Sequence, residues 1–418
     1  MIVTARASIQ AALVAFILGC AMAPDADAAS AVTNREVAKH LTEAKKLAAS
    51  KRWDAALAAL GKADRVPGGS AYAEYKIDEF RAYVLTQQRK YTEAGQLFER
   101  LAKSDLASAD IRIAHLKTAS QLYLRAKQYD ESARAAETAL NSRPDNAELL
   151  QLAGQAQYLA GDYRGAIESI GKLVAAAERA GDKPQEESLQ ILLNSHYRLS
   201  DREQIARTWE TLLRHYPQPD YWRNVLDLKQ AQPHDEQVEL YYLALTFDVG
   251  VLDDAEDFET LALGAIDLGL PSTAVRVLEA GLRDGILAGA TDETRFRRML
   301  SHARAEAAKA STMLPDWARH AQRVSSGQLD VELGRVYLSE QQYDRAITAL
   351  RRGIGKGGLR DPDQARIDLG EAYLKNGKSR EASQAFATVT ADSDWRELAD
   401  LWALRVREAS ERNETARR

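Results

Sequence analysis

Small and hydrophobic residues recur along this chain with the spacing of helices that come in pairs. Leu333, Gly334 and Tyr337 lie at positions i, i+1 and i+4, which places them on one face of a helix. Ala346 and Leu350 share a face of the helix that follows. Only a short polar segment separates the two, so the pattern predicts an antiparallel helix pair. Because Gly334 and Ala346 are small, the two backbones are expected to approach each other closely.

This pattern returns at a nearly fixed spacing. Residues 369–389 repeat residues 333–353 at a distance of 36 positions. A period of this length is typical of helical repeat arrays, in which each helix pair buries its apolar faces against its neighbours. The small and aromatic residues that define the repeat are Gly154, Ala166, Gly334, Tyr337, Ala346, Gly370, Tyr373 and Ala382.

The order Leu-Gly-x-x-Tyr, a short turn and then Ala-x-x-x-(Leu/Phe) resembles the tetratricopeptide repeat (TPR). The resemblance implies an all-α, right-handed superhelical solenoid of about nine to ten helix hairpins. The first five hairpins are expected at 37–67, 72–102, 113–143, 147–178 and 186–216, with Tyr197 and Ala206 on pattern in the fifth. Trp395, Leu398 and Trp402 share one face of a further segment, which predicts a C-terminal capping helix followed by a frayed tail.

The regularity of the pattern divides the chain into five parts. They are a secretory signal at 1–28, an N-terminal TPR array at 29–216, degenerate TPR-like repeats at 217–325, a C-terminal TPR pair at 326–393, and the capping helix with its tail at 394–418. Within the degenerate part, residues 290–313 are expected to form one helix and residues 316–324 its partner.

The first thirty residues have the layout of an export signal. Arg6 precedes an apolar run from Ala11 to Ala23, and small residues follow at Ala26 and Ala28. The run is short for a transmembrane helix, which needs about 20 apolar residues. The sequence therefore predicts cleavage near Ala28 and a periplasmic protein.

Cys20 is the only cysteine, and it leaves a second interpretation open. Ile-Leu-Gly-Cys resembles the bacterial lipobox, which implies acylation of Cys20 and an outer-membrane lipoprotein. Otherwise Cys20 is removed with the signal, and the mature chain has no cysteine for a disulfide. The mass of the mature N-terminus separates the two, and membrane contact is expected only with lipidation.

Composition and motifs give no sign of a catalytic or cofactor site. The net charge of −5 with mixed signs does not favour nucleic acid. Gly353, Gly355 and Gly358 match a dinucleotide fingerprint, and residues 372–379 loosely match a phosphate loop, but both follow predicted helices instead of strands. No two of the seven histidines are spaced as metal ligands on one helix. We therefore expect no enzyme activity, no metal and no cofactor.

The remaining function is binding. In the TPR family the first helices of the hairpins line a concave groove, and the resemblance implies a protein or peptide partner there. The residues expected to face this groove are Lys117, Gln121, Arg125, Gln151, Gln155, Tyr158, Ser195, Arg198, Arg335 and Glu371, beside the apolar Ile191, Val331, Leu338, Ile367 and Leu374.

A narrower resemblance concerns the sequence of three segments in the middle and near the end of the chain. YPQPDYWRNVL, FETLALGAIDLGLPSTAVRVLEAGL and GIGKGGLRDPDQARIDLGEAYLKNGKSREASQAF resemble periplasmic repeat proteins that accompany TonB-type energy-transduction systems of Gram-negative bacteria. This implies a partner in the cell envelope and an accessory role near TonB, ExbB and ExbD.

Overall fold

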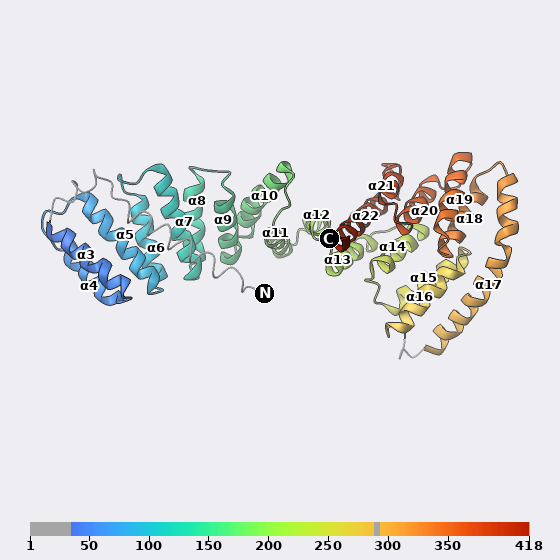
Figure 1. The fold of residues 1–418 in the computed structure, drawn as a ribbon, viewed down its shortest axis with the longest axis horizontal. Helices are drawn as coiled ribbons and strands as arrows, with labels where there is room; N and C mark the ends of the chain where they lie inside the picture. Colours follow the sequence, from blue (N-terminus) through green and yellow to red (C-terminus); the bar gives the residue numbers. More distant parts are fainter. Residues whose placement is uncertain (1–34, 288–292, 418) are drawn as a thin grey trace. The chain divides into compact units, whose positions relative to one another are not determined.

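A computed structural model describes residues 35–287 and 293–417 of the chain. All regular elements in these two ranges are α-helices, twenty in number, and they follow one another as hairpins (Figure 1). They make nine successive pairs, and α17 and α22 stand outside the pairing. The predicted all-α solenoid of TPR-like hairpins is therefore confirmed as the fold class.

The chain divides into two compact units, residues 1–208 and residues 209–418, which we call the N-terminal and the C-terminal unit. The division falls inside a helix, a short way before the boundary predicted after residue 216. The helices up to this point are α3 (Arg35–Ala49), α4 (Trp53–Asp64), α5 (Ala71–Gln87), α6 (Tyr91–Ala102), α7 (Ala109–Arg125), α8 (Tyr129–Leu140), α9 (Ala147–Ala160), α10 (Tyr163–Ala180), α11 (Glu186–Leu199) and α12 (Arg202–His215).

The C-terminal unit contains the end of α12 and all later helices. These are α13 (Pro219–Gln230), α14 (Glu236–Val249), α15 (Ala255–Asp267), α16 (Pro271–Arg283), α17 (Glu293–Arg323), α18 (Gln328–Ser339), α19 (Tyr343–Lys356), α20 (Pro362–Lys375), α21 (Ser379–Ala387) and α22 (Arg396–Arg417). The segments predicted as degenerate repeats, C-terminal pair and capping helix thus belong to one unit.

Glycines permit the close approach of the two helices in a hairpin. A Cβ added to Gly334 would lie 2.5 Å from Leu350 Cγ, and one added to Gly154 would lie 2.4 Å from Ile170 Cγ1. Gly370 approaches the ring of Phe386 in the same way. Real Cβ atoms do not tolerate such distances, so only glycine fits without a shift of the partner. The predicted close contact is confirmed, and Ala166, Ala346 and Ala382 are fully buried on the opposing helices.

The turn inside most hairpins has one residue in the left-handed backbone region. Glycine occupies this position in three hairpins, at Gly161, Gly269 and Gly377, whereas five hairpins have another residue there, at Lys51, Arg89, Lys127, Ser200 and Gln341. Gly377 belongs to the apparent phosphate loop, which is therefore a hairpin turn. The apparent dinucleotide fingerprint begins within α19 and ends in the turn after it. The phosphate-loop match is thus a turn between helices, whereas Gly353 and Gly355 of the fingerprint lie inside α19 and only Gly358 lies in the turn after it.

The first helices of the N-terminal unit lie in sequence order. α3 contacts α5, α7 contacts α9, and α9 contacts α11, while α4, α6, α8 and α10 each pack against the first helix on either side. Buried polar residues join this core in pairs. Tyr75 Oη lies 2.7 Å from His115 Nε2, between α5 and α7.

Helices far apart in sequence meet in the C-terminal unit. α14 contacts α22, α20 also contacts α22, and α16 contacts α18. The rings of Tyr241 and Trp395 pack edge to face, with centroids 5.0 Å apart. The predicted capping face is confirmed, because Trp395, Leu398 and Trp402 are all buried.

The predicted helix pair between residues 290 and 325 is wrong. A single long helix, α17, runs through this segment with Pro315 inside it. No residue near Pro315 provides the left-handed turn that a hairpin needs. Proline within a helix costs about 3 kcal/mol, which burial at both ends of α17 offsets: Phe296 and Leu300 join the core of α15 and α16, and Leu314 joins that of α18 and α19.

Two smaller predictions are corrected as well. In the fifth hairpin His196 and Ile205 are buried, whereas Tyr197 is 48% exposed, so the true register lies one residue before the predicted one. The tail predicted as frayed is helical through Arg417. Ion pairing from Arg412 to Glu408, four residues earlier, supports the helix there.

Candidate functional site

Three neighbouring first helices in the N-terminal unit present the same kinds of residue at matching positions. Positions are matched by counting back from the left-handed turn residues Lys127, Gly161 and Ser200. Ten residues back stand Lys117, Gln151 and Gln190; six back stand Gln121, Gln155 and Asn194; three back stand Leu124, Tyr158 and Tyr197. We call these nine residues the first-helix face. Steps of three and four residues keep each set on one side of its helix.

Polar contacts fix the first-helix face from one helix to the next. Lys117 Nζ lies 2.7 Å from Glu148 Oε2, which joins α7 to α9. The Ser188 hydroxyl donates to Gln151 Oε1 at 2.6 Å, which joins α9 to α11. Since α9 contacts both α7 and α11, the three rows are held at a regular spacing.

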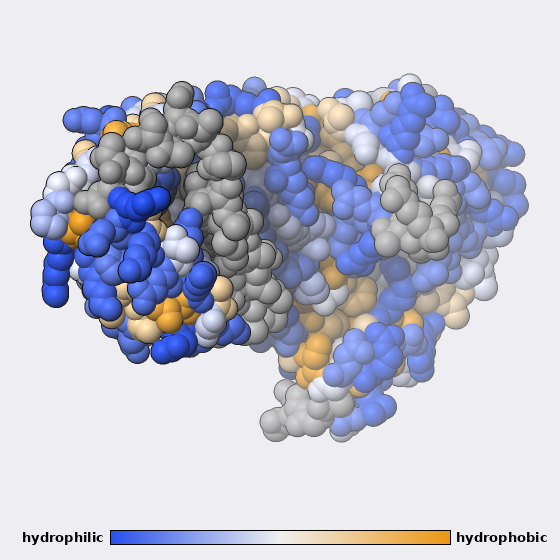
Figure 2. All heavy atoms as spheres, turned by 60° about the vertical axis from the view of Figure 1, so that its left-hand side comes forward, coloured by the Kyte–Doolittle hydropathy of each residue, from blue (hydrophilic) through white to orange (hydrophobic). Residues whose placement is uncertain are grey.

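Exposed apolar side chains concentrate at the end of this face. Six large hydrophobic side chains are conspicuously exposed in the described residues, and three of them, Leu159, Tyr197 and Leu199, lie at the C-terminal ends of α9 and α11. Tyr158 is partly buried, with its ring 5.9 Å from that of Tyr163. Hydrophilic residues cover much of the surface seen in Figure 2, with smaller hydrophobic areas between them. Such a concentration of exposed apolar groups is typical of an interaction site.

Most predicted groove residues of the N-terminal unit lie on or beside this face, but Ile191 and Ser195 are buried instead. Ser195 is fully buried, and its hydroxyl donates to the Ile191 carbonyl within α11. Its predicted exposure is therefore wrong, for the same one-residue register shift. Arg125 stacks over the Tyr91 ring at 5.9 Å, on α6, and Arg198 is exposed next to Tyr197.

Sequence reasoning missed Gln190, Asn194 and Tyr197. The turn residue hides the register, because Ser200 adopts φ 58 where glycine would have marked the position. The usable signal was the match of Asn194 and Tyr197 to Gln155 and Tyr158 when the fifth hairpin is aligned on Ser200.

In the C-terminal unit the predicted groove residues engage the unit's own helices. Arg335 Nε lies 2.6 Å from Asp368 Oδ2, and the Tyr241 hydroxyl of α14 donates to Asp368 Oδ1 at 2.5 Å. Burial, followed by the charge of Asp368, raises the pKa of Glu371 to about 7, and Arg276 opposes both. Arg335 and Glu371 therefore contribute to the interior of this unit, and contact of either with a partner stays a prediction.

A second ionic group ties the same helices together. Asp248 of α14 pairs with Lys375 of α20 and, at 2.9 Å, with Arg405 of α22. Burial, followed by the charge of Arg405, lowers the pKa of Lys375 to about 8. The indole of Trp222 donates to Glu408 at 3.2 Å. These contacts join the first helices of the unit to its last ones.

The described residues form neither a metal-binding group nor a helix suited to cross a membrane. No group of three or more histidine, cysteine, aspartate and glutamate side chains there is arranged to hold a metal ion. None of the described helices combines the length and the apolar character that crossing a membrane requires. The predicted signal at 1–28, with Cys20, lies outside the described residues.

Comparisons with known proteins find structural likeness only. No family model matches the chain, and no curated protein matches it. YrrB, described as a TPR protein with an unusual peptide-binding site, is 15% identical, with a TM-score of 0.32, over 46% of this chain and 90% of that one. A tetratricopeptide repeat protein from Parabacteroides merdae is 12% identical, with a TM-score of 0.34, over 65% and 100%.

A third solved structure is TTC0263, a TPR protein of Thermus thermophilus. It is 15% identical, with a TM-score of 0.25, over 46% of this chain and 98% of that one. At these scores no argument about function follows. The structural neighbours are TPR proteins, as the repeat pattern predicts, and the hairpins of this chain have the close glycine contacts and recurrent turns described above.

Proposed function

We propose that this chain is a binding scaffold that holds an extended protein segment along the first-helix face of α7, α9 and α11. The observation that carries the proposal is the recurrence of Tyr158 and Tyr197 beside Gln155 and Asn194 on neighbouring helices. A binding role accounts for these residues, and no reaction is needed to explain them.

The chemistry of the rows suits an extended backbone. Side-chain amides donate and accept hydrogen bonds, so Gln121, Gln155 and Asn194 match the alternating N–H and C=O groups of a strand-like segment. Tyrosine offers a large contact area at low conformational cost, and interfaces favour it for that reason. Because each hairpin repeats these groups, successive parts of one segment are bound by successive helices.

The cellular setting forms part of the proposal. The N-terminal segment favours export, so the scaffold is placed in the periplasm, with a partner in the cell envelope. The resemblance to TonB-associated repeat proteins suggests an accessory role near TonB, ExbB and ExbD. Acylation of Cys20 is the alternative, in which the same scaffold is tethered to the outer membrane.

The test uses a photo-crosslinking amino acid placed in the full-length protein within cells. One variant has it at Asn194, on the first-helix face, and the control has it at Thr138, an exposed position on the second helix α8. We expect discrete protein adducts from position 194 and far fewer from position 138. Combining the probe at 194 with Tyr158→Ala and Tyr197→Ala should reduce the adducts at least about fivefold, since loss of an interface side chain worth about 1 kcal/mol already gives that factor.

A matched control tests for non-specific binding through exposed apolar side chains. Leu106 is 45% exposed, close to the 48% of Tyr197, but lies before α7 and off the face. Leu106→Ala should leave the adducts unchanged. Equal adducts from positions 138 and 194, or adducts that survive the loss of both tyrosines, would show that the first-helix face is not the binding site.

A further inference from the structure

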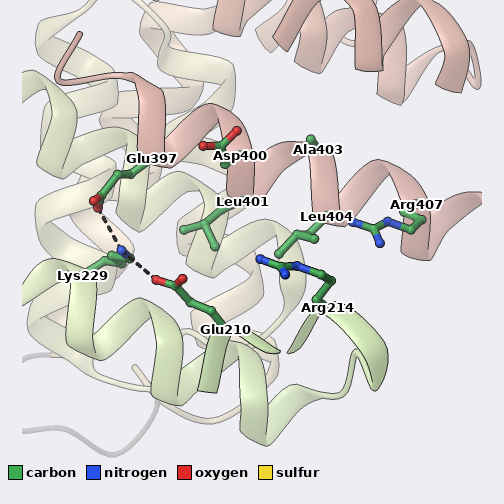
Figure 3. A pocket seen from close by; sticks show the side chains of 9 residues that line it. All are labelled: Glu210, Arg214, Lys229, Glu397, Asp400, Leu401, Ala403, Leu404 and Arg407. Carbon is green, nitrogen blue, oxygen red and sulfur yellow. Dashed lines mark hydrogen bonds and ion pairs between the residues drawn. The ribbon is translucent and has the colours of Figure 1, made fainter. Parts of the chain in front are cut away.

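A pocket of about 420 Å³ lies within the C-terminal unit, between the end of α12, α13 and α22 (Figure 3). Arg214 comes from α12, and Arg407 comes from α22, on the other side of the pocket. Leu401 and Leu404 of α22 extend into the space between the helices. Pockets of roughly 300–1,000 Å³ are of the size that small ligands occupy.

The carboxylates that line this pocket already have cationic partners. Lys229 Nζ lies 2.9 Å from Glu210 and 2.9 Å from Glu397, as the dashed lines in Figure 3 mark. Burial works against the Lys229 charge, but its hydrogen bonds with both glutamates outweigh this and raise its pKa. Asp400 pairs at 2.5 Å with Arg396. Each acidic group of the pocket therefore has a cationic partner within the protein, and Glu210 and Glu397 share one.

The two arginines are not neutralised. Arg214 and Arg407 are exposed, and within the described residues no ion pair or hydrogen bond engages either guanidinium. Arg214 and Arg407 are thus the lining cations that have no carboxylate partner among the described residues. Because Lys229 offers one positive charge to two glutamates, the lining residues together with Arg396 carry a net charge of +1. Leu401 is 4% exposed and Leu404 is partly buried, so the surface beside the two charges is apolar.

We propose that this pocket binds a carboxylate carried on a short apolar group. The carboxylate would pair with Arg214 and Arg407, because guanidinium groups bind carboxylates in a fork of parallel hydrogen bonds. The apolar group would lie on Leu401 and Leu404. A free carboxylic acid and the end of a protein chain with an apolar last residue both have this chemistry. The site is separate from the first-helix face and goes beyond the function proposed above.

An inorganic anion would leave half of the pocket unused. Phosphate matches the two arginines but makes no use of the leucines, and a neutral apolar molecule matches the leucines alone. Only a ligand with both features occupies the charges and the apolar surface together. The experiment must therefore test whether binding needs both the carboxylate and the apolar group of the ligand.

The experiment is isothermal titration calorimetry of the full-length protein with two probes. One is hexanoate, and the other is an acetylated tripeptide with a free leucine carboxylate at its end. We expect at least one of them to bind, and which one binds identifies the source of the carboxylate. Hexanamide and the tripeptide amide, which lack the charge, should bind at least about tenfold more weakly, because a hydrogen-bonded ion pair of this kind is worth that factor or more.

Variants of the lining residues test whether the probe binds in this pocket. Arg214→Gln and Arg407→Gln should each weaken the successful probe about tenfold, and Leu404→Ala should weaken it severalfold. Arg351→Gln is the matched control, an exposed arginine on α19 that does not line the pocket, and it should change nothing. All three arginines are exposed, so these substitutions leave the fold intact.

Three outcomes would overturn the proposal. They are no binding of either probe, equal binding of the amides, and binding that Arg351→Gln weakens as much as the two pocket variants do. Phosphate binding as tight as the successful probe would also contradict it, since the leucines would then have no role. None of these results depends on the crosslinks at Asn194, so this site and the first-helix face can fail independently.

Discussion

The N-terminal and C-terminal units are built from the same hairpin but use their first helices differently. In the N-terminal unit each first helix contacts those on either side, and the amide and tyrosine rows remain accessible. In the C-terminal unit α14 and α22 meet, and Asp368 of α20 pairs with Arg335 of α18 and accepts a hydrogen bond from Tyr241 of α14. One repeat pattern thus yields a linear array in one unit and a closed interior in the other.

The difference lies in a few charged and aromatic residues. One oxygen of Asp368 pairs with Arg335, and the other accepts a hydrogen bond from Tyr241. Asp248 forms ion pairs with Lys375 and Arg405. Buried charges are stable only when paired and hydrogen-bonded. Where the sequence provides such partners on distant helices, the interior closes; where it provides amides and tyrosines, no distant helix covers the first helices in the described part of the N-terminal unit.

The largest expected effect concerns the closed interior. Asp368→Ala leaves the Arg335 guanidinium partly buried without its partner, and breaking a buried pair costs about 3–5 kcal/mol. We expect the C-terminal unit to lose about this much stability. Five of the six tryptophans lie in residues 209–418, so tryptophan fluorescence during urea unfolding reports mainly on this unit, and Trp53→Phe makes it exclusive.

The matched variant in the N-terminal unit is Glu148→Ala, which removes the exposed ion pair with Lys117. Exposed pairs contribute about 0–1 kcal/mol, so this variant should unfold nearly as the natural protein does. A loss below about 1 kcal/mol for Asp368→Ala would mean that the interior is not held by its ionic contacts, and the contrast between the units would fail.

Contacts between residues close in sequence could be predicted from the sequence, whereas contacts between residues far apart in sequence could not. The hairpins follow from local spacing, because Gly334 meets Leu350 and Gly154 meets Ile170 within one repeat. The closure of the C-terminal unit does not, since Tyr241 and Asp368 lie 127 residues apart and no periodicity links them. Likewise Tyr158 was predicted to face the groove from its repeat, whereas Tyr197 was assigned to the repeat pattern itself because Ser200 occupies the turn usually marked by glycine.

An effect of intermediate size is an opposite response of the two units to pH. Burial raises the pKa of Glu371 to about 7 from an ordinary 4.5. Between these values the folded C-terminal unit holds a proton that the unfolded chain releases, so its stability falls as pH rises, by roughly 3 kcal/mol or less over the interval.

In the N-terminal unit burial is the largest cause that lowers the pKa of His115 below 6.5. Lys76 also lowers this pKa, and Glu79 raises it. The unfolded chain then binds the proton first, so the stability of the N-terminal unit falls as pH drops below about 6.5.

Urea unfolding of the Trp53→Phe protein at pH 5 and pH 7 measures the C-terminal response. We expect a higher midpoint at pH 5, and Glu371→Gln should remove the difference, because glutamine does not titrate. Hydrogen exchange of α5 and α7, corrected for intrinsic rates, measures the N-terminal response and should show more protection at pH 7. Slopes of the same sign in both units would contradict the assignment of these two groups.

The smallest expected effect tests what the two units share. Lys127 adopts φ 60 in a hairpin turn of the N-terminal unit, and Gln341 adopts φ 59 in one of the C-terminal unit. The left-handed region costs an ordinary residue about 1–2 kcal/mol, whereas glycine enters it freely but makes the unfolded chain more flexible, by about 0.4–1 kcal/mol. Lys127→Gly and Gln341→Gly should therefore each stabilise their unit by about 0.5–1 kcal/mol.

Hydrogen exchange of the flanking helices measures the stability change of both variants. The control is Gly377→Ala, at φ 73, which should destabilise its unit. Similar gains in the two units would show that the hairpin turn is the same device in both, so that their difference arises in side-chain contacts between hairpins. A gain in only one unit would place part of the difference in the turns themselves.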